Sequence, residues 1–207
     1  KRVKEIIRAA DKLGIKAITL FAFSTENWVR PKIEINMLMR SLDAFLEKEI
    51  DSLDKNNIRF MVIGKEDPLP GYIQKKLKKA QERTKDNTGL ALVLALNYGS
   101  RQEIVDAAKA FGRQVSTGNA SIEDLDVDKF SRYFYTAGLP DPDLLIRTSG
   151  EMRLSNFLLW QLAYSEFYFT DTLWPDFDEA AFNLAIESYQ KRERRFGRTS
   201  EQLKESK

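Results

Sequence analysis

Hydrophobic and polar residues follow two different periods along the chain, and these periods predict helices and strands in alternation. Apolar residues three or four positions apart predict helices over residues 3–13, 34–53, 72–84, 102–115, 127–135 and 178–189. Short unbroken apolar runs predict strands over residues 15–23, 58–63, 90–96, 144–146 and 165–169. The runs at 15–23 and 90–96 are typical of strands buried on both faces of a parallel sheet.

Strands that alternate with helices over a whole chain are typical of the α/β class. We therefore expect a single open, largely parallel sheet flanked by helices, with right-handed crossovers. No internal repeat or clear domain boundary interrupts the pattern, so we expect one domain over residues 1–207. Open α/β sheets bind ligands beyond the carboxyl ends of their strands, and the polar loops expected there cover residues 24–30, 97–101 and 147–155.

The composition excludes several classes of chemistry. Of 207 residues, 43% are hydrophobic and 31% charged, an ordinary globular balance. The net charge of +2 gives no overall field for nucleic acid. Cysteine and histidine are both absent, which excludes disulfides, thiolate or imidazole metal sites and a Ser-His-Asp triad. Acid–base chemistry therefore falls to carboxylates, amides, hydroxyls, water or a phosphate of the substrate.

Membrane and targeting signals are not visible either. No apolar run reaches the roughly 20 residues that a membrane span needs, and no stretch reads as a signal peptide. We therefore expect a cytoplasmic protein.

The third polar loop gathers cations and small polar residues. Arg147 ends a predicted strand, residues 148–150 (Thr-Ser-Gly) allow a sharp turn with exposed N–H groups, and Arg153 follows. Ser155 and Asn156 are favoured helix N-caps, so we expect a helix start with free N–H donors there. Guanidiniums bind oxyanions bidentately, so the combination indicates a diphosphate site. Taken alone, Arg147 is more typical of a solvated strand end.

Glu166 lies among aromatic residues in the predicted strand over 165–169. Burying a carboxylate there is costly unless it meets a cation, a donor or a metal. Mg²⁺ would suit it, because this ion takes carboxylate and phosphate oxygens together. Alone, however, Glu166 is more typical of a hydrogen-bonded or partly exposed carboxylate.

Three further stretches have a functional and an ordinary interpretation. The loop over residues 24–31 is either a ligand site or a turn with a helix cap. The apolar stripe over 34–53 is either core or partly the lining of an apolar channel. The cations at Lys75, Lys76, Lys78 and Lys79 are most typical of a solvated helix face, and the lack of interleaved aromatic residues argues against nucleic-acid binding.

The chain resembles the cis-prenyltransferase (isoprenyl transferase) family over nearly its whole length. The loops that carry the resemblance read FSTENWVRP over residues 23–31 and RTSGEMRLSNF over 147–157, followed by WPDF at 174–177. Shorter motifs in the right order add to it: NTG at 87–89, NYG at 97–99 and RRFG at 194–197. The resemblance implies this family's α/β fold and not a dinucleotide-binding Rossmann fold.

The resemblance also implies a role for each candidate residue. Arg147, Arg153 and Ser155 would bind the diphosphate of isopentenyl diphosphate, and Leu154 would also contact substrate. Glu166 would belong to a Mg²⁺ site. In the first loop, substrate contacts are implied for a set of five residues: Ser24, Thr25, Glu26, Trp28 and Arg30. Asn27 is associated with proton removal, and Trp28 and Arg30 lie in a segment that closes over substrate, which keeps an allylic cation from water.

The implied reaction is repeated 1′-4 condensation of isopentenyl diphosphate with an allylic diphosphate such as farnesyl diphosphate. Its product is a long cis-polyprenyl diphosphate such as undecaprenyl diphosphate, the precursor of the cell-wall lipid carrier. The implied partners are a second copy of the chain, reached by an arm around Arg195 and Gly197, and a membrane surface contacted at product release.

The sequence also departs from the family pattern. The first family motif, a strand ending in Met-Asp-Gly-Asn that supplies the principal metal ligand, is expected before Lys1. Met152 stands where some relatives have histidine, and Ser100 and Arg198 stand where glycine is common. These departures leave a second hypothesis open, a non-catalytic partner subunit of the same fold.

Overall fold

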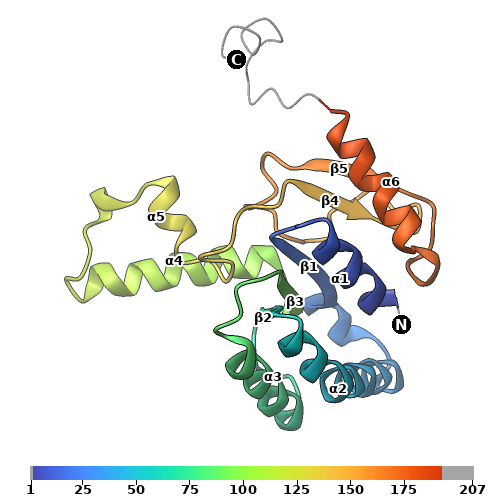
Figure 1. The fold of residues 1–207 in the computed structure, drawn as a ribbon. Coiled ribbons are helices and arrows are strands. Elements are labelled where there is room, and N and C mark those ends of the chain that lie inside the picture. Colours follow the sequence, from blue (N-terminus) through green and yellow to red (C-terminus); the bar gives the residue numbers. More distant parts are fainter. Residues whose placement is uncertain (1, 193–207) are drawn as a thin grey trace, which may run out of the picture. The chain divides into compact units, whose positions relative to one another are not determined.

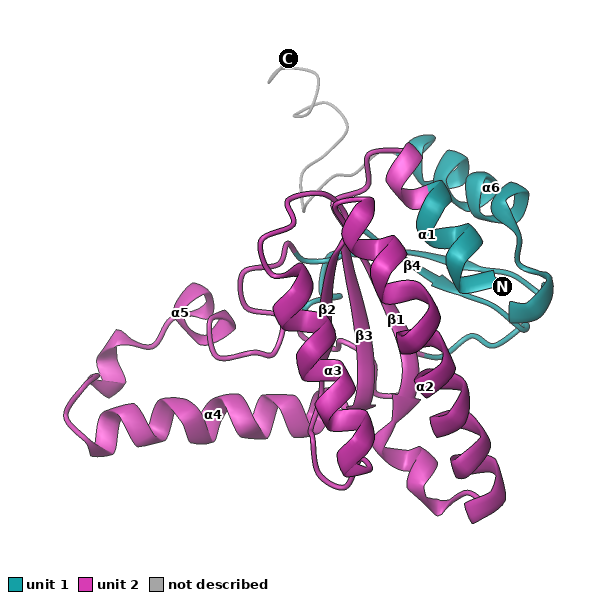
Figure 2. Ribbon diagram, turned by 60° about the horizontal axis from the view of Figure 1, so that its bottom comes forward, with its two compact units in different colours: residues 1–9, 141–153, 161–207 teal, residues 10–140, 154–160 magenta. Residues whose placement is uncertain are grey.

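The computed structural model describes residues 2–192, and these form two compact units. Among these residues, unit 1 contains 2–9, 141–153 and 161–192, and unit 2 contains 10–140 and 154–160 (Figure 2). Helices and strands alternate up to residue 116, whereas the last two strands, over 144–147 and 166–169, follow each other with no helix between them (Figure 1). The α/β class and the parallel pairing of strands are therefore confirmed, with the strands arranged in two sheets where the sequence predicts one.

Unit 2 is built on a three-stranded parallel sheet in the order β1-β3-β2. The strands are β1 (Ala17–Ser24), β2 (Arg59–Ile63) and β3 (Ala91–Tyr98). Ala17 and Arg59 both pair with Ala91, so the three strands start level and point the same way. Their carboxyl ends therefore share one sheet edge, which carries the loops after Ser24 and Tyr98.

The sheet is not evenly buried. Every residue of β3 is buried, as its unbroken apolar run predicts, because β3 lies in the centre of the sheet. In β1 only Phe23 is buried, so the prediction of burial on both faces is wrong for this strand. Its position at the edge of the three-stranded sheet explains the difference.

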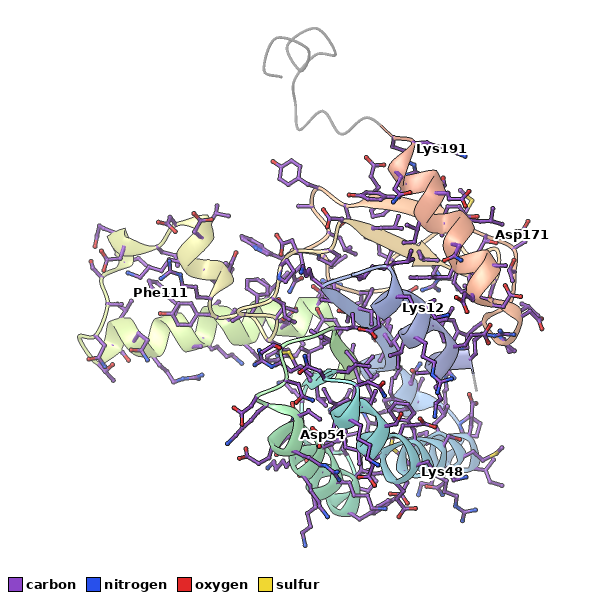
Figure 3. All side chains as sticks on the ribbon, in the orientation of Figure 1. Lys12, Lys48, Asp54, Phe111, Asp171 and Lys191 are labelled. Atoms are coloured by element: carbon purple, nitrogen blue, oxygen red, sulfur yellow. The ribbon has the colours of Figure 1, made fainter. Side chains whose placement is uncertain are left out.

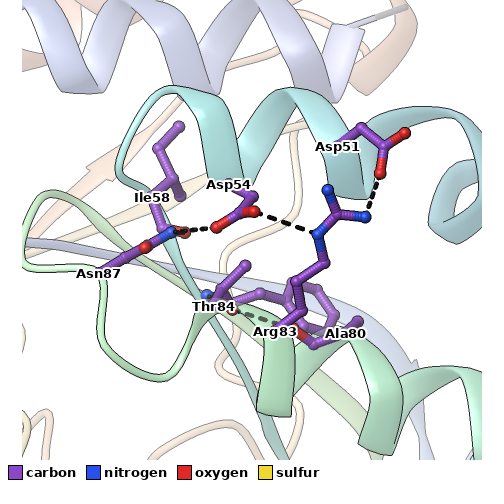
Figure 4. Close-up of polar contacts among 8 residues, drawn as sticks. Asp51, Asp54, Ile58, Ala80, Arg83, Thr84 and Asn87 are labelled. Atoms are coloured by element: carbon purple, nitrogen blue, oxygen red, sulfur yellow. Dashed lines mark hydrogen bonds and ion pairs between the residues drawn. The ribbon is translucent and has the colours of Figure 1, made fainter.

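Helices α2 (Lys32–Lys55) and α3 (Gly71–Thr84) pack against each other and against β2 (Figure 2). The buried members of the α2 stripe are Ile35, Met39, Leu46 and Leu53, which supports the core interpretation for these residues. Polar contacts join the end of α2 to the end of α3 and to the residue before β2 (Figure 4). Arg83 of α3 bonds Asp51 and Asp54 of α2, and Asn87 donates to the carbonyl of Ile58 at 2.9 Å.

The basic face of α3 is partly structural as well. Lys76 forms ion pairs with Asp43 and Glu47 of α2. One of the four predicted solvated lysines therefore joins the two helices, while Lys75, Lys78 and Lys79 are exposed.

Helix α4 (Ser100–Ser116) runs away from the sheet and carries α5 (Val127–Ser131) near its far end (Figure 1). Phe111 lies on the side of α4 that faces α5 (Figure 3), and its ring meets that of Tyr133. Phe130 and Phe134 pack on Trp160. The helix predicted to reach residue 135 ends at Ser131, where the chain turns to place Phe134 in this cluster.

Unit 1 contains the parallel pair β4 (Leu144–Arg147) and β5 (Glu166–Phe169), helix α6 (Glu179–Gln190) and the start of α1 (Arg2–Lys12). Leu144 pairs with Glu166 and Arg147 with Phe169. Arg2 of α1 donates to the carbonyl of Pro175, and Glu5 accepts from the N–H of Glu179 at the start of α6.

No helix starts after Ser155, so that prediction is wrong. Ser155, Asn156 and Leu158 have φ angles of +51°, +62° and +44°, which a right-handed helix does not allow. Among residues 2–192, none of the helices combines the length and apolar composition that a membrane span needs.

Candidate functional site

The loop after β1 folds as a short 3₁₀ helix over Thr25–Val29. Asn27 accepts a hydrogen bond from the backbone N–H of Ser24 at 2.9 Å, a contact typical of a capping box. The capping interpretation of this loop is therefore correct for the side-chain oxygen of Asn27, whereas its NH₂ group has no hydrogen bond among residues 2–192.

Trp28 is fixed from two sides. Its ring meets Phe23 edge-on with centroids 4.8 Å apart, and its indole N–H donates to Asn97 at 2.7 Å. The Asn97 amide in turn donates to the carbonyls of Lys65 and Asp67. These contacts hold Trp28 against the sheet edge. Arg30 takes no part in them and forms an ion pair with Glu34.

Asn156 joins the separate loops of unit 2. Its NH₂ group donates to Glu26 at 2.8 Å, and its side-chain oxygen accepts from the N–H of Arg101 at 2.8 Å. Its backbone carbonyl accepts from Ser100, also at 2.8 Å. One residue therefore sets the position of the loop after β1 relative to the loop after β3.

Gly99 is required at this junction. A Cβ at this position would lie 2.7 Å from both the Asn156 amide nitrogen and the Thr25 hydroxyl. A side chain at this position would displace the Asn156 amide or the Thr25 hydroxyl, so glycine favours the close approach of the three loops.

Glu26 is ionised more readily than an ordinary glutamate. Burial would raise the pKa of Glu26, but hydrogen bonds from Asn156, its own backbone, Ser24 and Thr25 outweigh this effect and lower it. The loop therefore presents a stable negative charge at the sheet edge.

A buried polar cluster of Tyr98, Glu103 and Tyr135 lies next to this sheet edge. The Tyr98 hydroxyl donates to Glu103, which also accepts from the N–H of Tyr135 at 2.8 Å. Glu103 and Tyr98 are both fully buried. Burial and the nearby Glu103 carboxylate raise the pKa of Tyr98, so its hydroxyl acts as a donor in the core and not as an acid.

In unit 1, the loop after β4 is bonded to the loop after β5. The N–H groups of Ser149 and Gly150 donate to the carbonyls of Thr172 and Thr170 at 2.9 and 3.0 Å. The expectation that this turn offers its N–H groups to an anion is therefore wrong for these two residues. These two N–H groups are therefore not available to a ligand.

The two arginines keep most of their donors unused. Among residues 2–192 the Arg147 guanidinium has no hydrogen bond or ion pair, and Arg153 has one, with Glu151. The Arg153 side chain is 61% exposed. Both groups are therefore available to an oxyanion at little cost in broken contacts.

Glu166 lies apart from the strand end that carries Arg147. The register pairs Glu166 with Leu144, three residues before Arg147, a separation of about 10 Å along the strand. Its carboxylate accepts from Arg192 at 2.9 Å.

A magnesium ion fits this arrangement only together with a phosphate ligand. The described residues contain no group of three or more acidic side chains able to hold a metal. Mg²⁺, however, is commonly bound through one or two carboxylates plus substrate phosphates and water. The Glu166 carboxylate, 32% exposed, can supply one such ligand.

The structure thus assembles part of the predicted site. One sheet edge of unit 2 carries five of the predicted residues: Ser24, Thr25, Glu26, Asn27 and Trp28. Unit 2 also contains Leu154 and Ser155. Unit 1 contains the other three: Arg147, Arg153 and Glu166. Arg195 and Gly197 lie outside the described residues. The sequence analysis did not predict that Asn156 and Asn97 connect these loops. The one signal in the sequence was that both residues lie in the motifs that carry the family resemblance.

Comparison with known proteins gives consistent matches. A family model described as "Putative undecaprenyl diphosphate synthase" matches residues 1–197. The isoprenyl transferase of Geobacter sulfurreducens is 52% identical over 201 residues, 97% of this chain and 82% of that protein. The ditrans,polycis-undecaprenyl-diphosphate synthase ((2E,6E)-farnesyl-diphosphate specific) of Micrococcus luteus is 50% identical over 195 residues, 94% and 78% of the two chains.

A solved structure agrees as well. Lavandulyl diphosphate synthase from Lavandula x intermedia, in complex with dimethylallyl diphosphate, has a TM-score of 0.92 at 42% identity. The match covers 95% of this chain and 85% of that one. The similarity therefore extends over nearly all of the chain in both sequence and fold.

Proposed function

This chain belongs to the cis-prenyltransferase family of undecaprenyl diphosphate synthases, and we propose that it elongates an allylic diphosphate with isopentenyl diphosphate. The observation that carries the proposal is the similarity, over nearly the whole chain, to proteins named as transferases and synthases of prenyl diphosphates. Farnesyl diphosphate is the primer we favour, and a long polyprenyl diphosphate is the product.

Each cycle breaks a C–O bond and a C–H bond, forms one C–C bond and shifts the position of one C=C bond. The C1–O bond of the allylic diphosphate breaks with both electrons leaving on diphosphate, and C4 of isopentenyl diphosphate attacks C1. A proton then leaves, which creates the new cis double bond. Negative charge on the leaving group is the main electrostatic problem, so cationic donors are the groups expected to dominate the site.

Arg147 and Arg153 are proposed to bind the diphosphate of isopentenyl diphosphate. Arg147 ends β4 and Arg153 lies in the loop that follows, and their donors are largely unused among residues 2–192, which supports the proposal. Leu154 and Ser155 directly follow Arg153 and would extend the contact.

Mg²⁺ is the proposed cofactor, with Glu166 as the ligand this chain supplies. When bound together with diphosphate, the ion would neutralise developing charge on the leaving group. The partly exposed carboxylate at the start of β5 supports this role.

The loop after β1 is proposed to contact substrate through Ser24, Thr25, Glu26, Trp28 and Arg30. An amide is a poor base, so we assign Asn27 to orienting a proton path toward phosphate or water. The NH₂ group of Asn27, which makes no hydrogen bond among residues 2–192, supports this assignment.

Radiolabelled isopentenyl diphosphate, farnesyl diphosphate and Mg²⁺ provide the test, with the protein expressed together with whatever its gene encodes before Lys1. Label is expected in a butanol-extractable product that migrates as a long polyprenyl diphosphate. A product with only one added unit would contradict repeated elongation. No incorporation at all would instead favour the non-catalytic subunit.

Two partners complete the proposal. A second copy of the chain would cover Phe167 and Phe169, which are 37% and 36% exposed on β5. A membrane surface would receive the apolar product, and Val29, Ile33 and Met37 suit such a contact because they lie four residues apart and are 91%, 77% and 64% exposed. Light scattering and vesicle co-sedimentation test the two contacts.

A further inference from the structure

Arg192 is the one described side chain that forms an ion pair with Glu166. The same terminal nitrogen also donates to the carbonyl of Phe167 at 2.9 Å. The backbone N–H of Arg192 bonds the carbonyl of Tyr189 at 3.0 Å, which extends the last turn of α6. The guanidinium is therefore held at the start of β5 by the end of a helix.

The carboxylate can bind both cations at once only at an energetic penalty. Mg²⁺ binds carboxylate oxygens at about 2.0–2.1 Å and tolerates little distortion, and a guanidinium on the same group would repel it. A metal ion that uses Glu166 must therefore displace Arg192 or share the carboxylate at a penalty.

The existing pair is weak enough to be displaced. Both side chains are 32% exposed, so solvent screens their attraction, and pairs of this kind contribute little to stability. Displacement also leaves the guanidinium beside a site proposed to collect phosphate oxygens, which are ligands that arginine prefers.

From these observations we infer that Arg192 is a positioning residue: it holds the Glu166 carboxylate in the resting protein and competes with the divalent cation for it. This inference rests on the proposed role of Glu166 in metal binding. Its consequence is that metal binds poorly alone and better once a diphosphate is present to accept the released guanidinium.

Metal affinity is the direct readout. Free Mn²⁺ is measured by electron paramagnetic resonance during titration of the full chain, with and without inorganic pyrophosphate. For Arg192→Gln without pyrophosphate, Mn²⁺ should bind about two- to fivefold more tightly, the range of a weak ion pair. With pyrophosphate the gain should shrink or reverse, because the guanidinium no longer helps to bind the anion.

The neighbouring Lys191 supplies a matched control. Lys191→Gln removes the same charge one residue away from a side chain that makes no ion pair with a described acidic group, so it should leave Mn²⁺ affinity unchanged. Arg192→Lys keeps the charge with fewer donors and should give an intermediate affinity. It also keeps the test valid if Arg192→Gln folds poorly, and thermal unfolding of each variant identifies that case.

The outcomes separate the inference from the proposal beneath it. If Glu166→Gln weakens Mn²⁺ binding but Arg192→Gln behaves like Lys191→Gln, competition is refuted while Glu166 remains a ligand. If Glu166→Gln has no effect, both the metal role of Glu166 and the inference are wrong. Loss of the Arg192→Gln gain in the Arg192→Gln/Glu166→Gln double variant supports the competition.

Discussion

The candidate residues of unit 2 and those of unit 1 are held in opposite ways. In unit 2 the loop residues bond one another: Asn27 caps its own turn, Asn97 holds Trp28, and Asn156 joins Glu26 to Arg101. In unit 1, by contrast, Arg147 has no polar partner among residues 2–192 and Arg153 has one.

This difference separates shaping from binding. A side chain whose hydrogen-bonding groups are used by the scaffold gives the site its shape, and its loss should lower stability and activity together. A guanidinium whose donors are unused contributes little to the fold and is available to ligand. Its loss should lower activity alone.

Arg147→Ala and Arg153→Ala test the arginines of unit 1 and should have the largest effects. Each removes the charge-assisted hydrogen bonds that we propose to the diphosphate, worth about 1.5–3 kcal/mol, so kcat/KM should fall about 10- to 100-fold in the radiolabel assay. The melting temperature should change by less than about 2 °C, because few contacts are lost. Lys191→Ala serves as a charge-matched control that keeps activity. A variant that melts much earlier would place these arginines in the scaffold.

Gly99→Ala tests the contacts among the loops of unit 2. The new Cβ would lie 2.7 Å from Asn156 and Thr25, and overpacking of this kind costs about 1–3 kcal/mol. Denaturant unfolding should show that loss together with lower activity. Gly112→Ala on α4 is the matched control, because nothing lies within 4 Å of its Cβ and alanine favours a helix by up to about 1 kcal/mol. Equal stability of the two variants would contradict the close approach at Gly99.

The same contrast explains what could be predicted from the sequence. Helices, strands and the loops after β1 and β3 follow from apolar periodicity, because a buried face must be apolar whatever the rest of the fold does. The use of particular polar groups does not follow. Ser149 and Gly150 read as free donors, yet their N–H groups bond the loop after β5.

Long-range pairing is the missing information. Ser155 and Asn156 have good cap propensity, but local propensity cannot predict that Asn156 bonds Arg101, 55 residues away. The register that places Glu166 three residues before Arg147 is equally non-local. The edge position of β1 depends on which strands pair, so its partial exposure could not be read from its apolar run.

Asn156→Ala and Asn156→Gly separate the side chain from its backbone. Both remove the bonds to Glu26 and Arg101, at a cost of about 1–2 kcal/mol. Alanine adds strain because Asn156 has a φ of +62°, whereas glycine adopts that angle freely. We therefore expect Asn156→Ala to be the less stable by about 1 kcal/mol, with kcat reduced by less than about 10-fold in both. Identical stabilities would mean that the backbone at this position relaxes.

Glu26→Gln should give the smallest effect. It tests whether a charge on the loop after β1 also contributes to the stability of unit 2. The folded pKa of Glu26 is lowered, so its ionised form stabilises the fold above the unfolded pKa of about 4.3. That contribution is lost as the pH falls through the folded pKa. Because Glu26 is exposed, the wild type should exceed the variant by less than about 1 kcal/mol at pH 7. Unfolding measured at pH 7 and pH 3 should show this difference closing. A difference that persists at pH 3 would instead come from the shape of the loop.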